Sequence, residues 1–438
     1  MESSARSIAH RLGERGHVAY FAGGCVRDLL RGQVAKDFDI ATDARPADVQ
    51  KIFPRTYAVG AHFGVIVVLE KEFQFEVATF RSDGAYIDGR HPVEVHFATA
   101  EEDAARRDFT INGMFFDPEK EEVIDFVGGR DDLERRLVRA IGDPRQRFTE
   151  DRLRMLRAVR FATVLGFEID PATWEAVVAS APSITQISAE RIREELVKIF
   201  LSPNRGRGWD LLDTSGLMGA ILPELEAMKG CEQPPQFHPE GDVFKHTRIM
   251  LEMLSGEASL PLVFSVLFHD IGKPPTSVVD EEGRIRFNGH DRIGAEMTEA
   301  IMERLRFSRA EIDATVEAVR QHMVFKDVPN MRVAKLKRFM ARPTFNDELE
   351  LHRVDCASSH AMMDNYKFLL GKKEEFANEP IIPPPLVRGD DLIALGLKPG
   401  PKFGEILEAV ETRQLEGTLK DREEAIEWVR KEVQRLSG

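Results

Sequence analysis

The spacing of apolar residues changes near residue 145, and this change restricts the chain to a mixed α/β part followed by a long helical part. Before it, residues 64–69 form an apolar run typical of a buried strand. Residues 73–79 alternate between apolar and polar side chains, as a half-buried strand does. After it, helical spacing continues with short proline-containing breaks, of which 383–385 is typical of a linker. The sequence therefore predicts an α+β fold, in which a mixed β-sheet with helices precedes a mostly α-helical neck, body and tail.

The length of 438 residues is sufficient for several domains, at roughly 100–200 residues each. We expect four parts, bounded where the apolar pattern is interrupted. They are a head at 1–145, a helical neck at 146–236, a body at 237–365 and a helical tail at 366–438.

The balance of charge excludes a wholly basic, histone-like protein, because the formal net charge is −14. Two local strips are nevertheless basic: residues 130–160 carry a net +4 and residues 326–342 a net +5. Such strips can contact nucleic acid, although a solvated helix face is the more common explanation of a charge run.

The sequence favours a cytoplasmic protein that does not span a membrane. No apolar run approaches the roughly 18–20 residues that a bilayer requires, and the N-terminus has no apolar signal core. The three cysteines lie far apart, without a C-x-x-C pair, which argues against a disulfide framework or a zinc ribbon.

A glycine pair and two aspartates form the first candidate site. Gly23-Gly24 follows a short apolar strand and precedes a helical stretch at 26–31, so the backbone there can approach a phosphate closely. Asp37 and Asp39 are two residues apart and would point the same way on a strand. Two such carboxylates can hold two Mg²⁺ ions, roughly 3.5–4 Å apart, that activate a 3′-hydroxyl and neutralise a leaving pyrophosphate. A D-x-D pair alone is more often a surface turn, and Glu76 is a candidate third carboxylate.

Two later segments extend this site. Residues 106–113 combine cationic, acidic and amide groups suited to phosphates and ribose hydroxyls. On a helix over 150–160, Asp151, Arg154 and Arg157 would lie along one exposed ridge. An Asp–Arg pair can accept from an amino group and donate to a ring nitrogen, which selects cytosine and adenine over uracil and guanine. A helix with ordinary i,i+3 ion pairs is the alternative.

In this order, the segments resemble the class II tRNA nucleotidyltransferase and bacterial poly(A) polymerase family over about residues 18–225. The resemblance implies a nucleotidyltransferase palm in the head, with Asp37 and Asp39 as catalytic ligands of Mg²⁺. It implies that a nucleotide is bound by Gly24, Arg27, Arg107, Asp108, Asp151, Arg154, Arg157 and Arg160. Within that set Asp151 and Arg154 match the pair that templates C and A. Residues 86–92 resemble the loop associated with the switch from C to A addition.

The body carries a second constellation of histidines and aspartates. His269-Asp270-Ile271-Gly272-Lys273 is its centre, and imidazole together with carboxylate suits a divalent transition metal. This set resembles the HD metal-dependent phosphohydrolase domain over about 237–365. By that resemblance the metal ligands are His246, His269, Asp270 and Asp355, with His290 and His322 as further ligands or phosphate contacts. A metal-bound hydroxide could attack a phosphoester there, and a retained but inactive site is the alternative.

The two resemblances together lead us to expect addition of CCA, from CTP and ATP, to the 3′ acceptor arm of tRNA. The tail from Arg388 to Pro401 resembles the last module of HD-bearing relatives, and it would either contact tRNA phosphates or serve only in packing. Three alternatives stay open. The product could be a single A or a poly(A) tract, the chain could be a phosphohydrolase whose head only binds, or both sites could be silent in an RNA-binding protein.

Overall fold

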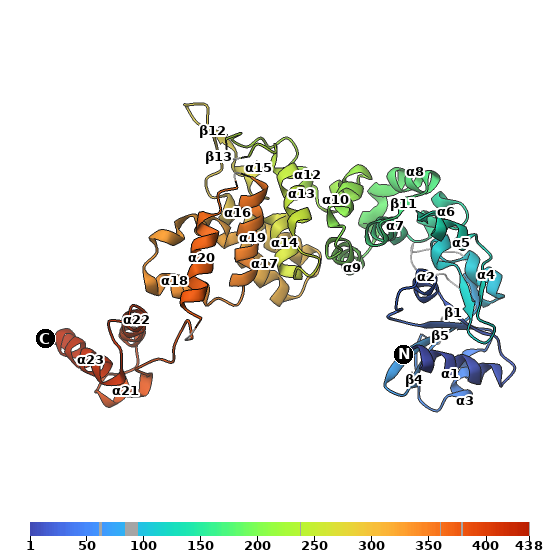
Figure 1. The fold of residues 1–438 in the computed structure, drawn as a ribbon, viewed down its shortest axis with the longest axis horizontal. Coiled ribbons are helices and arrows are strands. Elements are labelled where there is room, and N and C mark those ends of the chain that lie inside the picture. Colours follow the sequence, from blue (N-terminus) through green and yellow to red (C-terminus); the bar gives the residue numbers. More distant parts are fainter. Residues whose placement is uncertain (61–63, 84–94, 237, 360, 378–379, 438) are drawn as a thin grey trace. The chain divides into compact units, whose positions relative to one another are not determined.

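The computed structural model describes residues 1–60, 64–83, 95–236, 238–359, 361–377 and 380–437 (Figure 1). The chain divides into two compact units. The first contains residues 1–227 with two short later segments, 255–257 and 304–307, and the second contains the remaining residues. Each unit is described separately below.

A seven-stranded mixed sheet forms the head, with strand order β3-β4-β5-β2-β1-β8-β9. Strands β2 and β5 pair in parallel, and the other neighbours are antiparallel. Their bounds are β1 Ala19–Ala22, β2 Asp39–Thr42, β3 Thr56–Gly60, β4 Val65–Glu70, β5 Phe73–Thr79, β8 Phe115–Asp117 and β9 Glu122–Ile124. Helices α1 (Glu2–Gly13) and α3 (Pro46–Ile52) pack on the sheet through apolar side chains that form a common core (Figure 1).

The two strands expected from the apolar pattern are both present. In β5, Phe75 and Val77 are buried and Gln74 and Glu76 are exposed, which confirms the predicted alternation. The prediction of a fully buried strand at 64–69 is wrong in one respect. Only alternate residues of β4 are buried, Ile66 and Val68, and the residues between them are half-buried, which is the pattern of a strand with one face in the core.

The neck is helical, as predicted, apart from a two-residue parallel pairing. Strand β10 (Leu137–Val138) pairs with β11 (Glu168–Ile169) and so ties the end of the head to the neck. The helices around the site are α2 Gly24–Leu30, α4 Ala100–Ala105, α5 Gly129–Glu134, α6 Pro144–Glu150, α7 Leu153–Leu165 and α9 Ala189–Phe200. Leu153, Leu156 and Val159 of α7 are buried, as the helical spacing predicts.

The second unit is also mostly helical. Its histidines and aspartates come from α13 Val243–Met253, the end of α14 Leu260–Phe268, α16 His290–Arg304, η4 His322–Asn330 and α19 Phe345–Ser358. A short hairpin, β12 (Val278–Val279) and β13 (Ile285–Arg286), interrupts the helices. Gly272 allows α16 to begin close by, because a Cβ there would lie 2.2 Å from His290 O.

The tail has a small core of its own. Its helices are α21 Gly389–Ala394, α22 Pro401–Leu415 and α23 Arg422–Ser437, and apolar side chains from all three are buried together. The three cysteines are free. Within the described ranges, no helix combines the length and apolar character that a membrane crossing requires.

Candidate functional site

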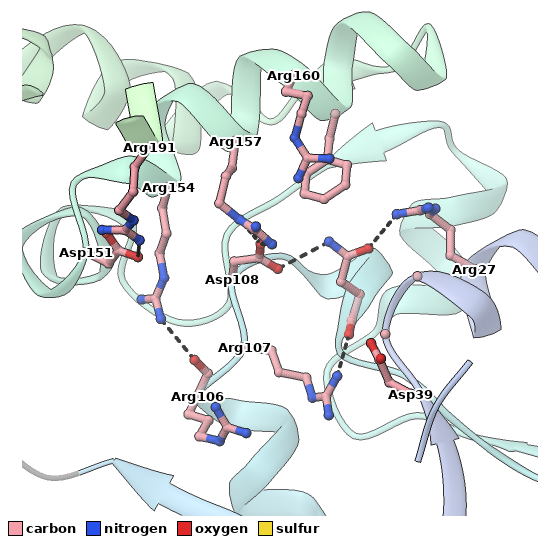
Figure 2. Close-up of a pocket in the computed structure, with 14 residues that line it drawn as sticks. Arg27, Asp39, Arg106, Arg107, Asp108, Asp151, Arg154, Arg157, Arg160 and Arg191 are labelled. Carbon is pink, nitrogen blue, oxygen red and sulfur yellow. Dashed lines mark hydrogen bonds and ion pairs between the residues drawn. The ribbon is translucent and has the colours of Figure 1, made fainter. Parts of the chain in front are cut away.

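A cavity of about 450 Å³ lies in the first unit, where the head meets the neck (Figure 2). The head contributes the turn at Gly23-Gly24, the start of β2, and the segment that follows α4. The neck contributes α7 and the first residues of α9. The lining residues are Gly23, Gly24, Arg27, Asp39, Arg106, Arg107, Asp108, Asn112, Asp151, Arg154, Arg157, Arg160, Phe161 and Arg191. The cavity therefore includes all the predicted nucleotide-binding residues, with Asp39 at its edge.

Three carboxylates meet at the start of β2. The parallel register that pairs Ile40 with Val77 places Glu76 beside Asp39. The surrounding protein partly desolvates Asp39 although the residue is exposed, and this desolvation together with Glu76 and Asp37 raises its pKa to about 6, while Arg107 acts in the opposite direction. The strand begins at Asp39, so the expectation that Asp37 shares the strand is wrong. Its charge nevertheless acts on Asp39.

This carboxylate set fits a hard divalent cation. Its donors are oxygen atoms, and their mutual repulsion makes a bound cation favourable. The compact groups of possible metal ligands among the described residues lie in the second unit, so the fit here rests on the donor type and on the repulsion between the carboxylates.

The glycine turn leaves room for an arginine. Gly23 has a φ of 72°, a left-handed conformation that favours glycine. A Cβ at this position would lie 3.3 Å from Arg107 Nη1 and 3.9 Å from Asp39 Oδ2. Arg27 of α2 donates to Asn112 Oδ1 at 2.8 Å and pairs with Asp28. The turn, both arginines and Asp39 thus surround one end of the cavity.

Asp108 is a buried carboxylate held by the neck. It pairs with Arg157 of α7 and accepts hydrogen bonds from Asn112 Nδ2 and from the Phe109 N–H. Burial opposes ionisation, but the Arg157 guanidinium outweighs it and lowers the pKa of Asp108 to about 2. Asp108 is therefore an ionised acceptor at neutral pH.

The predicted base-reading pair lies in the cavity, but not on one exposed helical ridge. Helix α6 ends at Glu150 and α7 begins at Leu153, so Asp151 lies in the break between them. Asp151 Oδ2 accepts from Arg191 Nη2 at 2.9 Å, and Oδ1 accepts from the Leu153 N–H. Both carboxylate oxygens therefore already have partners.

Arg154 is buried rather than exposed, which also corrects the ridge prediction. Its Nη1 donates to Glu150 Oε2 at 3.0 Å. Its Nη2 donates to Arg106 O at 3.1 Å, as Figure 2 shows. Arg154 is the second residue of α7, and it donates to the carbonyl oxygen of the residue that caps the end of α4, where a helix supplies no further N–H donors of its own. Asp151 and Arg154 thus share the cavity without pairing with each other.

The sequence analysis missed Arg191, which lines the cavity, and Arg147, which lies outside its lining. Arg191, on α9, lies forty residues after Asp151, and an arginine on an amphipathic helix carries no signal of its own. Arg147, on α6, donates to Ala105 O and to Arg107 O and thereby joins the neck to the head. Arg160, which was predicted, pairs with the buried Glu195 at 2.5 Å. The predicted loop at 86–92 lies outside the described residues.

The second unit brings the predicted histidines and aspartates together. Asp270 is central: its Oδ2 lies 3.1 Å from His269 Nε2, and its Oδ1 lies 3.6 Å from His290 Nε2. His290 Nε2 and His322 Nε2 are 3.2 Å apart. Asp355 Oδ1 lies 3.1 Å from His246 Nε2. Two groups able to hold a metal ion, His246-His269-Asp270 and Asp270-His290-His322, therefore share one carboxylate.

Charge within this cluster is strongly coupled. Burial opposes protonation of His246, but Asp355 and Glu240 raise its pKa to about 9. Burial lowers the pKa of His322 to about 4. Burial would raise the pKa of Asp270, but His269 and Lys273 lower it well below its usual range. His322 is therefore neutral beside the ionised Asp270, whereas His246 holds a proton that a bound cation would have to displace. Histidine and carboxylate donors together suit a divalent transition metal.

A cavity of about 390 Å³ opens onto this cluster. Its wall includes Asp270, His290, His322, Asp355 and two cations, Lys273 and Arg286. The sequence analysis missed Glu240, which accepts from Nδ1 of His246 at 2.7 Å and of His238 at 2.9 Å. Glu240 lies in a loop, where no periodicity indicates which way a side chain points.

Three family models match the chain. Residues 19–139 match the Poly A polymerase head domain, and residues 166–229 match the probable RNA and SrmB-binding site of polymerase A. Residues 242–357 match the HD domain.

Curated relatives and solved structures agree with these models. A CCA-adding enzyme of Bacillus pumilus is 33% identical over 424 residues, which cover 96% of this chain and 94% of the relative. One from Geobacillus stearothermophilus is 46% identical over 222 residues, 50% of this chain and about half (54%) of that relative's length. The crystal structure of the Bacillus stearothermophilus CCA-adding enzyme in complex with CTP is 29% identical, with a TM-score of 0.75 and coverage of 99% and 98%. The structure of the Thermotoga maritima CCA-adding enzyme complexed with tRNA is 19% identical, with a TM-score of 0.61. It covers 98% of this chain and 94% of its own, and at this identity it supports the fold alone.

Proposed function

The chain belongs to the CCA-adding enzyme family, and on that premise we propose that it adds C, C and A to the 3′ end of tRNA without a nucleic acid template. CTP and ATP are the substrates, and the acceptor arm of tRNA is the partner. The observation that carries the proposal is the cavity of the first unit, where Asp39, the glycine turn and the predicted base-reading pair line one space.

Different residues around the cavity bind the triphosphate, the ribose and the metal ions. Gly24, Arg27 and Arg107 bind the triphosphate, and the ionised Asp108 accepts from a ribose hydroxyl. Asp37 and Asp39, with Glu76 beside them, hold Mg²⁺. When bound, Mg²⁺ supplies charge neutralisation at the reacting phosphate. The geometry around these side chains orients the tRNA 3′-hydroxyl for in-line attack on the α-phosphate.

Base selection requires an exchange of partners. Asp151 gives up Arg191, and Arg154 gives up Glu150 or Arg106 O, when a cytosine or adenine edge arrives. Uracil and guanine place a carbonyl oxygen against the Asp151 carboxylate. They form no hydrogen bond there to offset the free energy lost when Asp151 and Arg154 give up their present partners. Arg157 and Arg160 lie beside the pair and hold the local geometry through Asp108 and Glu195.

Three tRNA transcripts test the proposal: one ending before CCA, one after the first C and one after CC. Each is incubated with Mg²⁺ and CTP, ATP or both, and the products are sized on a sequencing gel. Growth of the first transcript by three nucleotides with both substrates is the expected result. Growth of only the CC-ended transcript indicates an A-adding enzyme, and a long ATP-dependent ladder indicates a poly(A) polymerase. No growth overturns the proposal.

We propose a second activity, phosphohydrolysis, for the HD cluster. It is supported by two potential metal-binding groups that share Asp270 and by two cations in the same cavity wall. His246, His269, Asp270 and Asp355 would hold a divalent transition metal, with His290 and His322 as further ligands. Incubation of the Mn²⁺- or Ni²⁺-loaded protein with a 2′,3′-cyclic nucleotide tests it. Hydrolysis that Asp270→Ala abolishes supports the proposal, whereas metal binding without hydrolysis identifies a retained but inactive site.

We also propose that the protein acts in the cytoplasm and that it has four domains. These are the palm at 1–145, the neck at 146–236, the HD domain at 237–365 and the tail at 366–438. The body and tail contact tRNA through its shape and phosphates.

A further inference from the structure

Asp103 is a buried carboxylate that the proposed function leaves without a role. It lies on α4, outside the lining of the cavity, and its side chain is 2% exposed. A buried carboxylate requires cationic partners, because burial disfavours its charge. Arg106 and Arg107 lower the pKa of Asp103 although burial acts in the opposite direction. Both arginines line the cavity.

Each oxygen of Asp103 binds one of these arginines. Oδ1 accepts from Arg106 Nε at 2.9 Å and Nη2 at 2.7 Å, and from the Arg81 N–H at 3.2 Å. Oδ2 accepts from Arg107 Nε at 3.2 Å and Nη2 at 2.9 Å. One carboxylate thus fixes two guanidinium groups that are adjacent in sequence.

The hydrogen bonds between Arg107 and Asp103 occupy one edge of the guanidinium and leave the edge that carries Nη1 for a ligand. Asp103 occupies Nε and Nη2, and the third nitrogen, Nη1, points to the glycine turn. Nη1 lies 3.4 Å from Asn112 O and 3.3 Å from the position a Cβ of Gly23 would take. Figure 2 shows this guanidinium beside Asp39. An arginine fixed along one edge is preorganised to bind a phosphate with the other.

We infer that Asp103 is a positioning residue, which aims the Arg107 guanidinium at the nucleotide triphosphate between the glycine turn and Asp39. The inference rests on the proposed function, since it takes the triphosphate as the ligand of Arg107. Without the Asp103 charge, Arg107 would sample other rotamers, and each nucleotide would have to order it on binding. CTP and ATP should be affected equally, because the triphosphate is common to both.

The test compares Asp103→Asn with wild type. Asparagine keeps the size of the side chain and an oxygen for the Arg81 N–H, but loses the charge that holds the arginines. We expect the KM for CTP and for ATP to rise at least tenfold, with the KM for tRNA and the preference for C and A unchanged. The dissociation constants of CTP and ATP, measured by calorimetry with Mg²⁺, should rise in parallel. Asp103→Glu should restore part of the loss.

A matched control separates positioning from general stability. Asp132, on α5, is another buried aspartate paired with an arginine, Arg139, but it lies outside the cavity. Asp132→Asn should lower the melting temperature without raising the KM for nucleotides. In an Arg107→Ala background, Asp103→Asn should add less than a twofold further loss, because the residue that it positions is absent.

Three results overturn the inference. They are an unchanged nucleotide KM in Asp103→Asn, a rise no larger than in Asp132→Asn, or losses that multiply in the Arg107→Ala background. If Asp103→Asn does not fold, the same comparison is made with Asp103→Glu, whose longer side chain displaces the guanidinium and should raise the nucleotide KM above that of the control. Failure of the proposed function is distinguishable, because wild type itself would then not extend tRNA.

Discussion

The raised pKa of Asp39 opposes the ionisation that metal binding requires. A carboxylate whose pKa is about 6 binds a proton in the folded state where the unfolded chain, with an ordinary aspartate, has lost it. Between pH 4 and 6 the folded state therefore holds more protons, and its stability falls as the pH rises through that window. Asp39 costs stability at neutral pH and supplies a metal ligand in return.

We predict that Asp39→Asn stabilises the metal-free protein and abolishes nucleotide addition. Thermal melts in EDTA should give a higher Tm for Asp39→Asn at pH 7.5, and the gain should shrink as the pH falls from 6 to 4. In wild type, apparent Mg²⁺ affinity should weaken below about pH 6, as Asp39 takes up its proton. An equal Tm across the range would contradict the cost assigned to Asp39, and normal turnover would contradict its role as a ligand.

We predict that Asp151→Ala relaxes base choice. Loss of the acceptor removes the penalty on uracil and guanine. A good bidentate pair is worth about 1–3 kcal/mol of discrimination, or roughly 5- to 150-fold. Single-turnover incorporation of CTP, ATP, UTP and GTP measures the ratio. Asp131→Ala, an exposed aspartate of α5, is the control and should leave the ratio unchanged. Unaltered selectivity in Asp151→Ala would contradict the templating role.

At the scale of elements, close contact between helices assembles the HD cluster. Gly272 follows the His269-Asp270 pair, and α16 begins with His290 beside it. A Cβ at Gly272 would lie 2.2 Å from His290 O and 2.6 Å from Gly294 N, which are backbone atoms that cannot yield locally. The glycine therefore sets the distance between Asp270 and His290.

We predict that Gly272→Ala destabilises the second unit by at least about 2–3 kcal/mol, the range of severe overpacking. It should also lower bound metal, measured by mass spectrometry of the dialysed protein. Gly371→Ala is the matched control. It lies in helix α20 (Asp364–Glu375), and a Cβ there has no neighbour within 4 Å. Alanine should stabilise that helix slightly. Equal behaviour of the two variants would contradict this packing account.

The sequence predicted elements better than it predicted their ends. Alternation at 73–79 and the buried spacing of α7 follow directly from the periods of strand and helix. The break between α6 and α7 was missed because no glycine or proline marks it. Asp151 itself produces the break, since its side chain accepts the Leu153 N–H and pairs with Arg191, a residue distant in sequence. Local patterns carry no information about such a partner.

At the scale of the whole molecule, the tail, although part of the second unit, buries apolar side chains in a core of its own. Val387, Leu392, Ile406 and Val429 are buried together within residues 386–433, and Arg338 of the body pairs with Glu411 of α22. The proline-rich stretch at 383–385, the predicted linker, precedes this core in the sequence. A self-contained core can be removed without exposing that of the body.

We predict that a chain ending at residue 385 folds, binds CTP with unchanged affinity and loses affinity for tRNA. The loss should be larger at low salt, because phosphate contacts release counterions. Calorimetry with CTP and filter binding of tRNA at 50 and 200 mM salt measure the two effects. Full tRNA affinity in the shortened chain would identify the tail as a packing module only.

The arginines around the cavity of the first unit all have acidic partners within the described part of the chain. The ion pairs are Arg27–Asp28, Arg106–Asp103, Arg107–Asp103, Arg154–Glu150, Arg157–Asp108, Arg160–Glu195 and Arg191–Asp151. In this structure the positive charge of the cavity is therefore balanced by the carboxylates of the protein itself. A phosphate chain displaces a carboxylate wherever it needs the arginine edge that the carboxylate occupies, and each displacement has a cost. Arg107 is the exception, because Asp103 holds one edge of its guanidinium and leaves Nη1 directed toward the glycine turn. Stray polyanions that match only some of these positions gain little, so a site rich in arginine can stay vacant in a cell crowded with nucleic acid.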